Sequence, residues 1–305
     1  MLSRRSLHLG LLAVIAAGLL LLLTWRTLPP LNLELRSTWE KRNAFTSRSP
    51  NSRNLTIPDQ NPIPEKDVLN KTTLNKLQAL YHRYIMSSQV LCNRVTRMGN
   101  LHDGGWELCE DPLYAPTKEN CLVYSYGINF DFSFDDAMEK YGCEVHSFDP
   151  SMNERKVDHV RGQRVHFHPV GVAGVDKTIV ENSGTWHLYT IASHRRRLHH
   201  KLSERRLDVL KIDVEGYELE ALMTALDDGS LDDVRQLIFE THLTMMGGSP
   251  KKKNYVQYLT LLRKIYARGF RIHTTHRNMF SVFHNTLDDK DYVKCHEVHT
   301  VKVSK

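Results

Sequence analysis

The stretch of residues 121–150 limits the possible folds more than any other part of this chain. Residues 122–126 are an apolar and aromatic run, which predicts a short strand, and Gly127 then lets the chain turn with little steric penalty. A helix is predicted to begin at Ser133, because an aspartate follows it at the spacing of a capping box. Residues 144–148 predict a second strand. This order predicts a βαβ unit with a right-handed crossover.

The two strand ends of this unit are candidates for a ligand site. In an open parallel sheet, ligands bind outside the carboxyl ends of the strands, and an acid about 20 residues after a glycine turn can accept hydrogen bonds from ribose. Gly127 and Asp149 meet this description, but only one glycine of the G-x-G-x-x-G pattern is present. The pattern therefore favours a ligand with a ribose and no phosphate, such as S-adenosylmethionine. We predict cofactor contacts at Tyr126, Gly127, Asn129 and Asp149; the alternative is an ordinary βαβ element.

Three more polar residues are predicted at the same edge of the sheet. Residues 207–214 are the most strand-like run of the second half, and Asp213 and Glu215 stand at its carboxyl end. Asp213 is our first candidate for a base or an acceptor-positioning residue, because transfer of a group to a hydroxyl requires alignment of the oxygen and uptake of its proton. Alternatively, Asp213 and Glu215 hold a divalent cation, or Glu215 caps a helix. His242 follows a strand at 234–240 and is a second candidate base, because histidine can titrate near neutral pH.

Three runs of the sequence resemble a known family. Residues 123–135, 143–151 and 210–218 are similar to segments of the methyltransferase-like proteins of the secretory pathway. The last run also resembles the Lys-Ile-Asp-Val-Glu-Gly signature of FkbM-type O-methyltransferases. The resemblance implies an α/β domain of class I (Rossmann-like) with a seven-stranded, mostly parallel sheet, and S-adenosylmethionine as the cofactor.

Further cofactor contacts are predicted with the help of this resemblance. The resembling proteins carry a segment similar to residues 103–109, in which Trp106 and Glu107 could fold over a ligand; a turn anchored by a buried tryptophan is the alternative. His168 stands near the end of a predicted third strand at 164–172, where the adenine lies in this fold. A divalent metal is possible but not indicated, because there is no C-x-x-C spacing and the nearby histidines lack a carboxylate partner at ligand spacing.

The N-terminal part of the chain indicates a membrane anchor. Residues 9–25 are an uncharged apolar run behind two arginines, and no A-x-A cleavage pattern follows it. We predict a cytoplasmic tail at 1–8, an uncleaved signal-anchor helix at 9–25 and a lumenal stem at 26–66. A cleaved signal and a secreted protein are the alternative. Glycosylation sequons at Asn54 and Asn70 suit a lumenal stem.

Residues 67–305 are predicted to form the catalytic domain. Beyond the elements above, the apolar pattern predicts helices at 67–92, 217–226 and 255–267, and strands at 186–189, 270–274 and 292–303. The five cysteines are disulfide candidates in a lumenal protein, and Cys121 and Cys143 could pair because they begin adjacent predicted strands. Five cysteines allow several connectivities and leave at least one unpaired.

Charge excludes one class of partner. The net charge of +6 is modest and is concentrated in short runs such as 195–197 and 251–253. Because no basic stripe with interleaved aromatic residues is present, the sequence does not predict a nucleic-acid binder. The run at 195–197 predicts a solvated loop or helix; alternatively, it contacts an acidic acceptor such as a sulfated or uronic-acid glycan.

These features predict a lumenal S-adenosylmethionine-dependent O-methyltransferase that is held in the Golgi or endoplasmic reticulum membrane as a single-pass type II protein. The expected acceptor is a hydroxyl of a glycan or another small molecule. A Golgi glycosyltransferase shares the order of anchor, stem and domain and is one alternative, although a strand-terminal Asp-x-Asp is absent. A non-catalytic domain that keeps the fold is the other. The sequence does not indicate the oligomeric state.

Overall fold

The computed structural model describes residues 61–101, 103–152, 157–202, 204–245, 248–286 and 288–303. All of them belong to one unit that extends from Ile57 to Lys305. The predicted cytoplasmic tail, signal-anchor helix and most of the stem, with the sequon at Asn54, lie outside the described residues. Within the described part of the chain, no helix is both long enough and apolar enough to span a bilayer.

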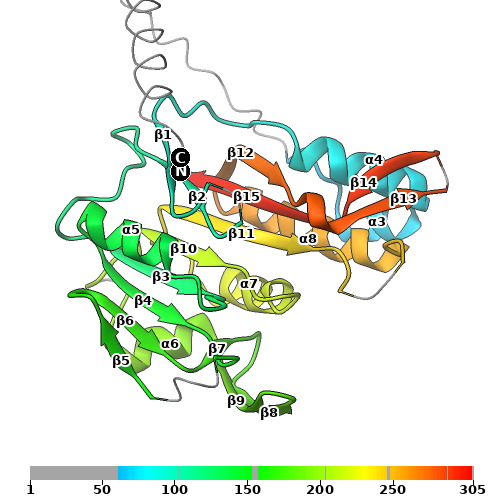
Figure 1. Cartoon of the computed structure of the whole chain (residues 1–305). Coiled ribbons are helices and arrows are strands. Elements are labelled where there is room, and N and C mark those ends of the chain that lie inside the picture. Colours follow the sequence, from blue (N-terminus) through cyan, green and yellow to red (C-terminus); the bar gives the residue numbers. More distant parts are fainter. Residues whose placement is uncertain are drawn as a thin grey trace, which may run out of the picture. The chain divides into compact units, whose positions relative to one another are not determined.

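A mixed sheet of eight strands forms the centre of the described structure (Figure 1). In spatial order the strands are β12 (Phe270–Arg277), β15 (Cys295–Lys302), β11 (Gln236–His242), β10 (Val209–Ile212), β3 (Leu122–Tyr126), β4 (Glu144–Phe148), β6 (Val165–His168) and β5 (His159–Arg161). The strands from β11 to β6 are parallel, whereas β15 runs antiparallel to both of its neighbours and β5 runs antiparallel to β6. The predicted α/β class and mostly parallel sheet are confirmed. The sheet has one strand more than predicted, because the short β5 extends its edge.

One face of the sheet packs against most of the helices. Every second side chain of the central strands points to this face, and Tyr124, Leu210 and Phe239 belong to its apolar core. The core is completed by α4 (Leu74–Ile85), α6 (Ile191–Arg197), α7 (Glu218–Asp227) and α8 (Lys252–Ala267). Figure 1 shows α7 beside β11, and α8 packs against α7 and β12.

The opposite face of the sheet packs against fewer helices and strands. The intervening side chains, among them Val123, Val209 and Ile238, form a second core. This core is shared with α5 (Ser133–Tyr141) and with a hairpin of β1 (Val95–Met98) and β2 (Trp106–Cys109). Because both faces are covered, the central strands are buried along their whole length or nearly so, as is typical of parallel strands.

One predicted helix is interrupted, and one predicted helix cap is absent. The lead-in helix is divided into α3 (Lys66–Lys71) and α4, because Thr72 and Thr73 have extended backbone angles. The capping box at Ser133 is wrong: Ser133 is the first residue of α5, and its hydroxyl accepts a hydrogen bond from the backbone N–H of Asn100 at 3.1 Å. The carboxylate of Asp131 instead accepts the N–H of Ser133, at 2.9 Å.

The predicted third strand is interrupted, because Pro169 has no N–H to continue the ladder. The chain leaves the main sheet after β6, and β7 (Gly171–Val172) joins a small sheet with β9 (Gly184–Tyr189) and β8 (Lys177–Glu181). Near the C-terminus, a hairpin of β13 (Val282–Asn285) and β14 (Lys290–Val293) precedes β15. The predicted strand at 292–303 therefore contains the end of one strand and the whole of another.

The basic run at 195–197 lies in α6, and its prediction as a solvated segment is wrong for its first member. The guanidinium of Arg195 is buried and donates to both carboxylate oxygens of Asp233, at 2.9 and 2.7 Å. Arg196 and Arg197 are exposed. An arginine can be buried in this way because a bidentate carboxylate contact compensates its charge.

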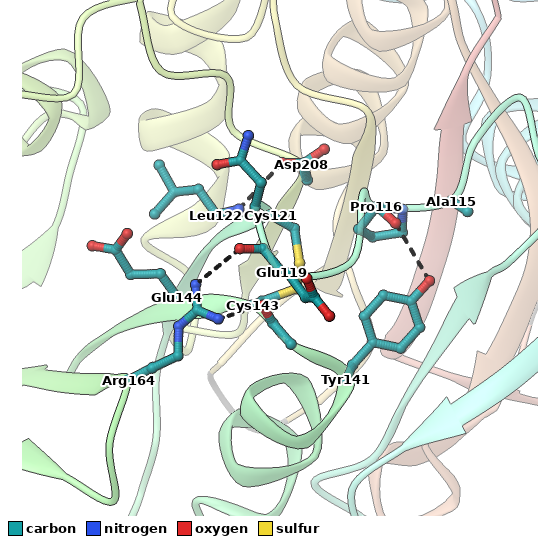
Figure 2. The surroundings of a disulfide bond; sticks show 12 residues. Ala115, Pro116, Glu119, Cys121, Leu122, Tyr141, Cys143, Glu144, Arg164 and Asp208 are labelled. Carbon is teal, nitrogen blue, oxygen red and sulfur yellow. Dashed lines mark hydrogen bonds between the residues drawn. A yellow bond between two sulfur atoms is a disulfide. The ribbon is translucent and has the colours of Figure 1, made fainter.

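Two disulfides, Cys92–Cys109 and Cys121–Cys143, occur in the described chain. The predicted pairing of Cys121 with Cys143 is therefore confirmed, and it joins the starts of β3 and β4 (Figure 2). Cys295 is buried and has a free thiol. Figure 2 also shows Arg164 and Tyr141 donating to backbone carbonyls of the segment that leads into β3.

Candidate functional site

A cavity of about 660 Å³ opens at the carboxyl ends of the parallel strands. Its wall is built from the turns that follow β3, β4, β10 and β11, and from the small sheet of β7, β8 and β9. Its volume lies within the range of about 300–1,000 Å³ that is usual for small-molecule sites. Six of the predicted site residues line it: Gly127, Asn129, Asp149, Asp213, Glu215 and His242.

Gly127 lets two strand ends approach each other closely. Its φ is +80°, which favours glycine. A Cβ at this position would lie 1.6 Å from the carbonyl oxygen of Asp213. Gly127 therefore brings the turn after β3 against the end of β10, and both turns face the same cavity.

Asp149 organises the wall beside this turn. One carboxylate oxygen accepts the N–H groups of Ile128 and Asn129, at 2.9 and 2.8 Å. The other accepts the N–H and the hydroxyl of Ser151, at 2.8 and 2.6 Å. Because a carboxylate has about four acceptor sites, the chain itself uses most of the capacity of Asp149. The residue shapes the turn on which a cofactor would rest, and a ribose hydroxyl would have to share or replace one of these bonds.

Asp213 and Glu240 form a hydrogen-bonded carboxyl pair at the ends of β10 and β11. Burial and the nearby charge of Glu240 raise the pKa of Asp213 to about 8, against the opposing effect of Lys211. Burial also favours the neutral form of Glu240, but hydrogen bonds from His242 and Asn278 lower its pKa overall. The pKa values of the two carboxyls are thus shifted in opposite directions, and Asp213 is the one that more readily takes up a proton.

His242 is surrounded by carboxylates. Its Nδ1 lies 3.2 Å from Glu218, and its Nε2 lies 3.4 Å from Glu240 and 3.5 Å from Glu215. Although burial lowers the pKa of His242, the hydrogen bonds to Glu218 and Glu240 and their charges raise it to about 12. The expectation that His242 titrates near neutral pH is wrong, because the imidazolium is the charge that compensates these carboxylates. Glu218 is fully buried and is also bonded by the hydroxyl of Tyr258, at 2.5 Å.

Two buried residues that the sequence analysis did not single out also line the cavity. Lys211 donates hydrogen bonds to the carbonyls of Tyr126 and Gly127, at 3.1 and 2.5 Å, and so fixes the backbone of the turn after β3. Asp135 accepts a hydrogen bond from Ser147, and burial raises its pKa to about 6. Lys211 belongs to the Lys-Ile-Asp run and could have been found there, whereas Asp135 resembles an ordinary acid in the first turn of a helix.

Four predicted cofactor contacts, Trp106, Glu107, Tyr126 and His168, are not on the cavity wall. Trp106 is buried in the smaller core with its ring 5.5 Å from the ammonium of Lys211. Tyr126 points to the opposite face of the sheet and stacks on Phe148. His168 bonds to His146 at 2.9 Å, and burial lowers its pKa to about 4. Each belongs to the structure that supports the site.

The cavity wall combines a group of apolar side chains with an excess of acidic ones. Phe148, Val172, Trp186 and Leu188 lie toward the small sheet, where a flat ring could be held by apolar contacts. Eight carboxyl residues line the cavity, against Lys211, Lys294 and His242 as cationic ones: Asp103, Asp131, Asp135, Asp149, Glu181, Asp213, Glu215 and Glu240. This excess of acids favours a ligand with positive charge over one with a diphosphate.

Comparison with known proteins shows the family to which this chain belongs. A family model described as a methyltransferase domain matches residues 39–299. Two curated relatives are both named "Probable methyltransferase-like protein 24". The rat protein is 27% identical over 223 residues, which are 68% of this chain and 60% of the relative. The human protein is 27% identical over 213 residues, which are 65% of this chain and 56% of the relative. The matched region thus spans less than two thirds of each relative.

A comparison with solved structures gives a weaker match. A structure from Thermoplasma acidophilum, described provisionally as a methyltransferase, has a TM-score of 0.30 and 11% identity. The match covers 62% of this chain and 70% of that one. A likeness of this size carries no argument about the site.

Proposed function

This chain belongs to the methyltransferase-domain family, and from that membership we propose that it is an enzyme that transfers a methyl group from S-adenosylmethionine to a hydroxyl oxygen. The observation that carries the proposal is the cavity, in which a glycine turn and Asp149 face the carboxyl pair of Asp213 and Glu240. The glycine turn with Asp149 suits the binding of the cofactor, and the carboxyl pair suits the uptake of the acceptor's proton.

The residues of the cavity fit this cofactor. S-adenosylmethionine, when bound, supplies a methyl group on a positively charged sulfonium. The turn at Gly127 and Asn129, braced by Asp149, would hold its ribose, and the apolar side chains near Trp186 would hold its adenine. The excess of carboxylates suits the positive charges of the molecule. By the same argument, a sugar nucleotide would bring its diphosphate into an acidic cavity, which disfavours the glycosyltransferase alternative.

Asp213 is the residue to which we assign proton uptake. The acceptor oxygen forms a bond to the methyl carbon as the carbon–sulfur bond breaks, and the hydroxyl proton passes to the carboxylate of Asp213. For this step Asp213 must be ionised, so the raised pKa makes it a stronger base than an ordinary aspartate. His242 keeps its proton and holds Glu240 in place. It acts as a positioning residue.

We further propose that the reaction takes place in the lumen of the Golgi or endoplasmic reticulum, on a glycan or another hydroxyl acceptor. The apolar run at 9–25, the stem and the sequons support this location. The two disulfides also support it, because such bonds persist in oxidising compartments. We propose a single-pass anchor, and a secreted form remains the alternative.

Binding of the cofactor is the direct test of the proposal. The full chain, expressed through a secretory route, is expected to bind S-adenosylmethionine and S-adenosylhomocysteine in calorimetry, and Asp149→Asn is expected to weaken both. A UDP-sugar with Mn²⁺ is the control ligand. Labelled methyl transfer to a panel of glycans then tests turnover. A folded protein that binds neither adenosyl compound would overturn the proposal, and binding without any transfer would favour the non-catalytic alternative.

A further inference from the structure

We infer that Glu107, His276 and His299 form a binding site for a divalent transition-metal ion, for which zinc is the expected occupant. The three residues come from β2, β12 and β15, and they lie outside the lining of the cavity. The inference is independent of the proposed methyl transfer.

The ligand atoms are already close enough for one ion. Oε2 of Glu107 lies 3.0 Å from Nε2 of His276 and 3.1 Å from Nε2 of His299. The three residues offer ligand atoms that all lie within 4.8 Å of one another. A tetrahedral zinc ion with bonds of about 2.0–2.2 Å keeps its ligand atoms about 3.2–3.6 Å apart. Small side-chain adjustments would therefore complete the site.

Two of these atoms lack another partner among the described residues. Nε2 of His299 is buried and makes no hydrogen bond within the described chain, and the buried Oε2 of Glu107 has only the two histidine contacts given above. The side chain of His299 is fully buried, with 0% exposure. Buried polar atoms are normally hydrogen-bonded, because leaving them unpaired is costly. A cation between the two atoms would satisfy both.

The other oxygen of Glu107 has a supporting contact. Oε1 accepts a hydrogen bond from Nη1 of Arg97 at 2.8 Å, across the hairpin of β1 and β2. Metal-binding carboxylates commonly have such a partner, which fixes their orientation. Arg97 therefore directs Oε2 toward the two histidines.

Three other groups of potential ligands occur in the described chain, and each has another explanation. One contains the disulfide Cys92–Cys109. In the second, both ring nitrogens of His146 already make hydrogen bonds. The third surrounds His242 and belongs to the candidate active site. The cluster at Glu107 is the one with a fully buried, unpartnered imidazole nitrogen aimed at a carboxylate.

The donor set selects the class of ion. Two imidazole nitrogens and one carboxylate oxygen suit zinc with a water in the fourth position, and the same donors also suit Fe(II). The two disulfides suit an oxidising compartment, and redox-inactive zinc suits the same conditions. The ion would join the β1–β2 hairpin to the antiparallel edge of the sheet. Trp106, the neighbour of Glu107, would then be held against Lys211 beneath the cavity.

The test measures metal in the full chain and in two matched variants. The purified protein is expected to contain about one zinc per chain by mass spectrometry, and the chelated protein should bind added Zn²⁺ in calorimetry. His276→Ala is expected to weaken Zn²⁺ binding at least tenfold. Its side chain is 45% exposed, so its removal leaves no large buried cavity. His284→Ala, which removes a side chain of 54% exposure from β13, should bind zinc like the wild type.

Two further readouts decide the outcome. Excess Zn²⁺ is expected to raise the unfolding temperature of the wild type by about 5 °C at a hundredfold excess over its Kd, and at the same concentration to raise that of His276→Ala by no more than about half as much. Fe(II) and Mn²⁺, added anaerobically, serve as competing ions. The inference is overturned if the folded wild type neither contains nor binds zinc, if His276→Ala binds zinc as tightly as the wild type, or if only Cys295→Ser abolishes binding, which would place the ion in the cavity.

Discussion

At the scale of single residues, Asp213 is expected to control the pH dependence of the proposed reaction. Its pKa is raised to about 8, so the carboxyl is mostly protonated at pH 7 and cannot accept a proton until it ionises. Turnover should therefore rise as the pH increases through about 8 and then level off. Asp213→Asn should lower kcat by about 10²–10⁴-fold, remove this pH dependence and leave S-adenosylmethionine binding intact. Labelled methyl transfer measured between pH 6 and 9 tests the prediction.

The control for this variant is Asp227→Asn, which changes an exposed carboxylate that pairs with Lys264 on the surface. It should keep both the wild-type rate and the wild-type pH profile. A kcat for Asp213→Asn within a factor of three of the wild type would show that another group takes up the proton.

His242 is expected to stabilise the fold by its charge. In His242→Gln the buried carboxylates of Glu218 and Glu240 lose their compensating cation, which should cost about 3–5 kcal/mol in the free energy of unfolding. Folding raises the pKa of His242 from 6.5 to about 12. The stabilisation is therefore complete below pH 6.5 and is lost as the pH rises toward 12. Urea unfolding at pH 6 and pH 9 should show a larger difference between wild type and variant at pH 6.

The comparison variant is His284→Gln, which changes a half-exposed histidine on β13. Its free energy of unfolding should stay within about 0.5 kcal/mol of the wild type. If the two glutamine variants are equally stable, the charge of His242 has no structural role.

At the scale of elements, the approach of β3 to β10 depends on Gly127. A Cβ there would meet the carbonyl oxygen of Asp213 at 1.6 Å, so Gly127→Ala must separate the two strand ends. We expect a loss of about 3 kcal/mol or more in the free energy of unfolding, and weaker cofactor binding. Gly248→Ala is a matched control, because Gly248 also has a positive φ but has no atom within 4 Å of an added Cβ. That variant should lose only about 1 kcal/mol. Equal losses in thermal or urea unfolding would contradict the steric argument.

The elements that could be predicted share one property: their signal lies in neighbouring residues. The bounds of β3 and β4 are predicted correctly because both strands are short runs bounded by turn residues, Gly127 after β3 and Gly142 and Pro150 around β4. The hairpins β8–β9 and β13–β14 were not recognised as hairpins, because they are partly exposed and lack a regular alternation of apolar and polar residues. Local patterns specify buried strands better than exposed ones.

At the scale of the whole molecule, the Cys121–Cys143 disulfide is expected to stabilise the described unit. It closes a sequence separation of 22 residues, for which loop entropy predicts about 3 kcal/mol. Replacing both cysteines by serine should lower the free energy of unfolding by this amount, measured in urea without reductant. Reductant should destabilise the wild type further than the double variant, because the variant has only Cys92–Cys109 left to lose. An unchanged stability in the double variant would show that the bridge is not formed.

The sequence by itself determined the α/β class, the βαβ unit around Gly127 and the placement of Asp149 and Asp213 at strand ends. These follow from local apolar patterns and from the rule that parallel strands end at one edge. Only the tertiary structure decided that the pKa of His242 is raised and that Trp106 is buried. It also decided the meeting of Glu107, His276 and His299. A pKa or a metal site depends on partners that are far apart in the chain, and side-chain positions become defined only when the strands pack.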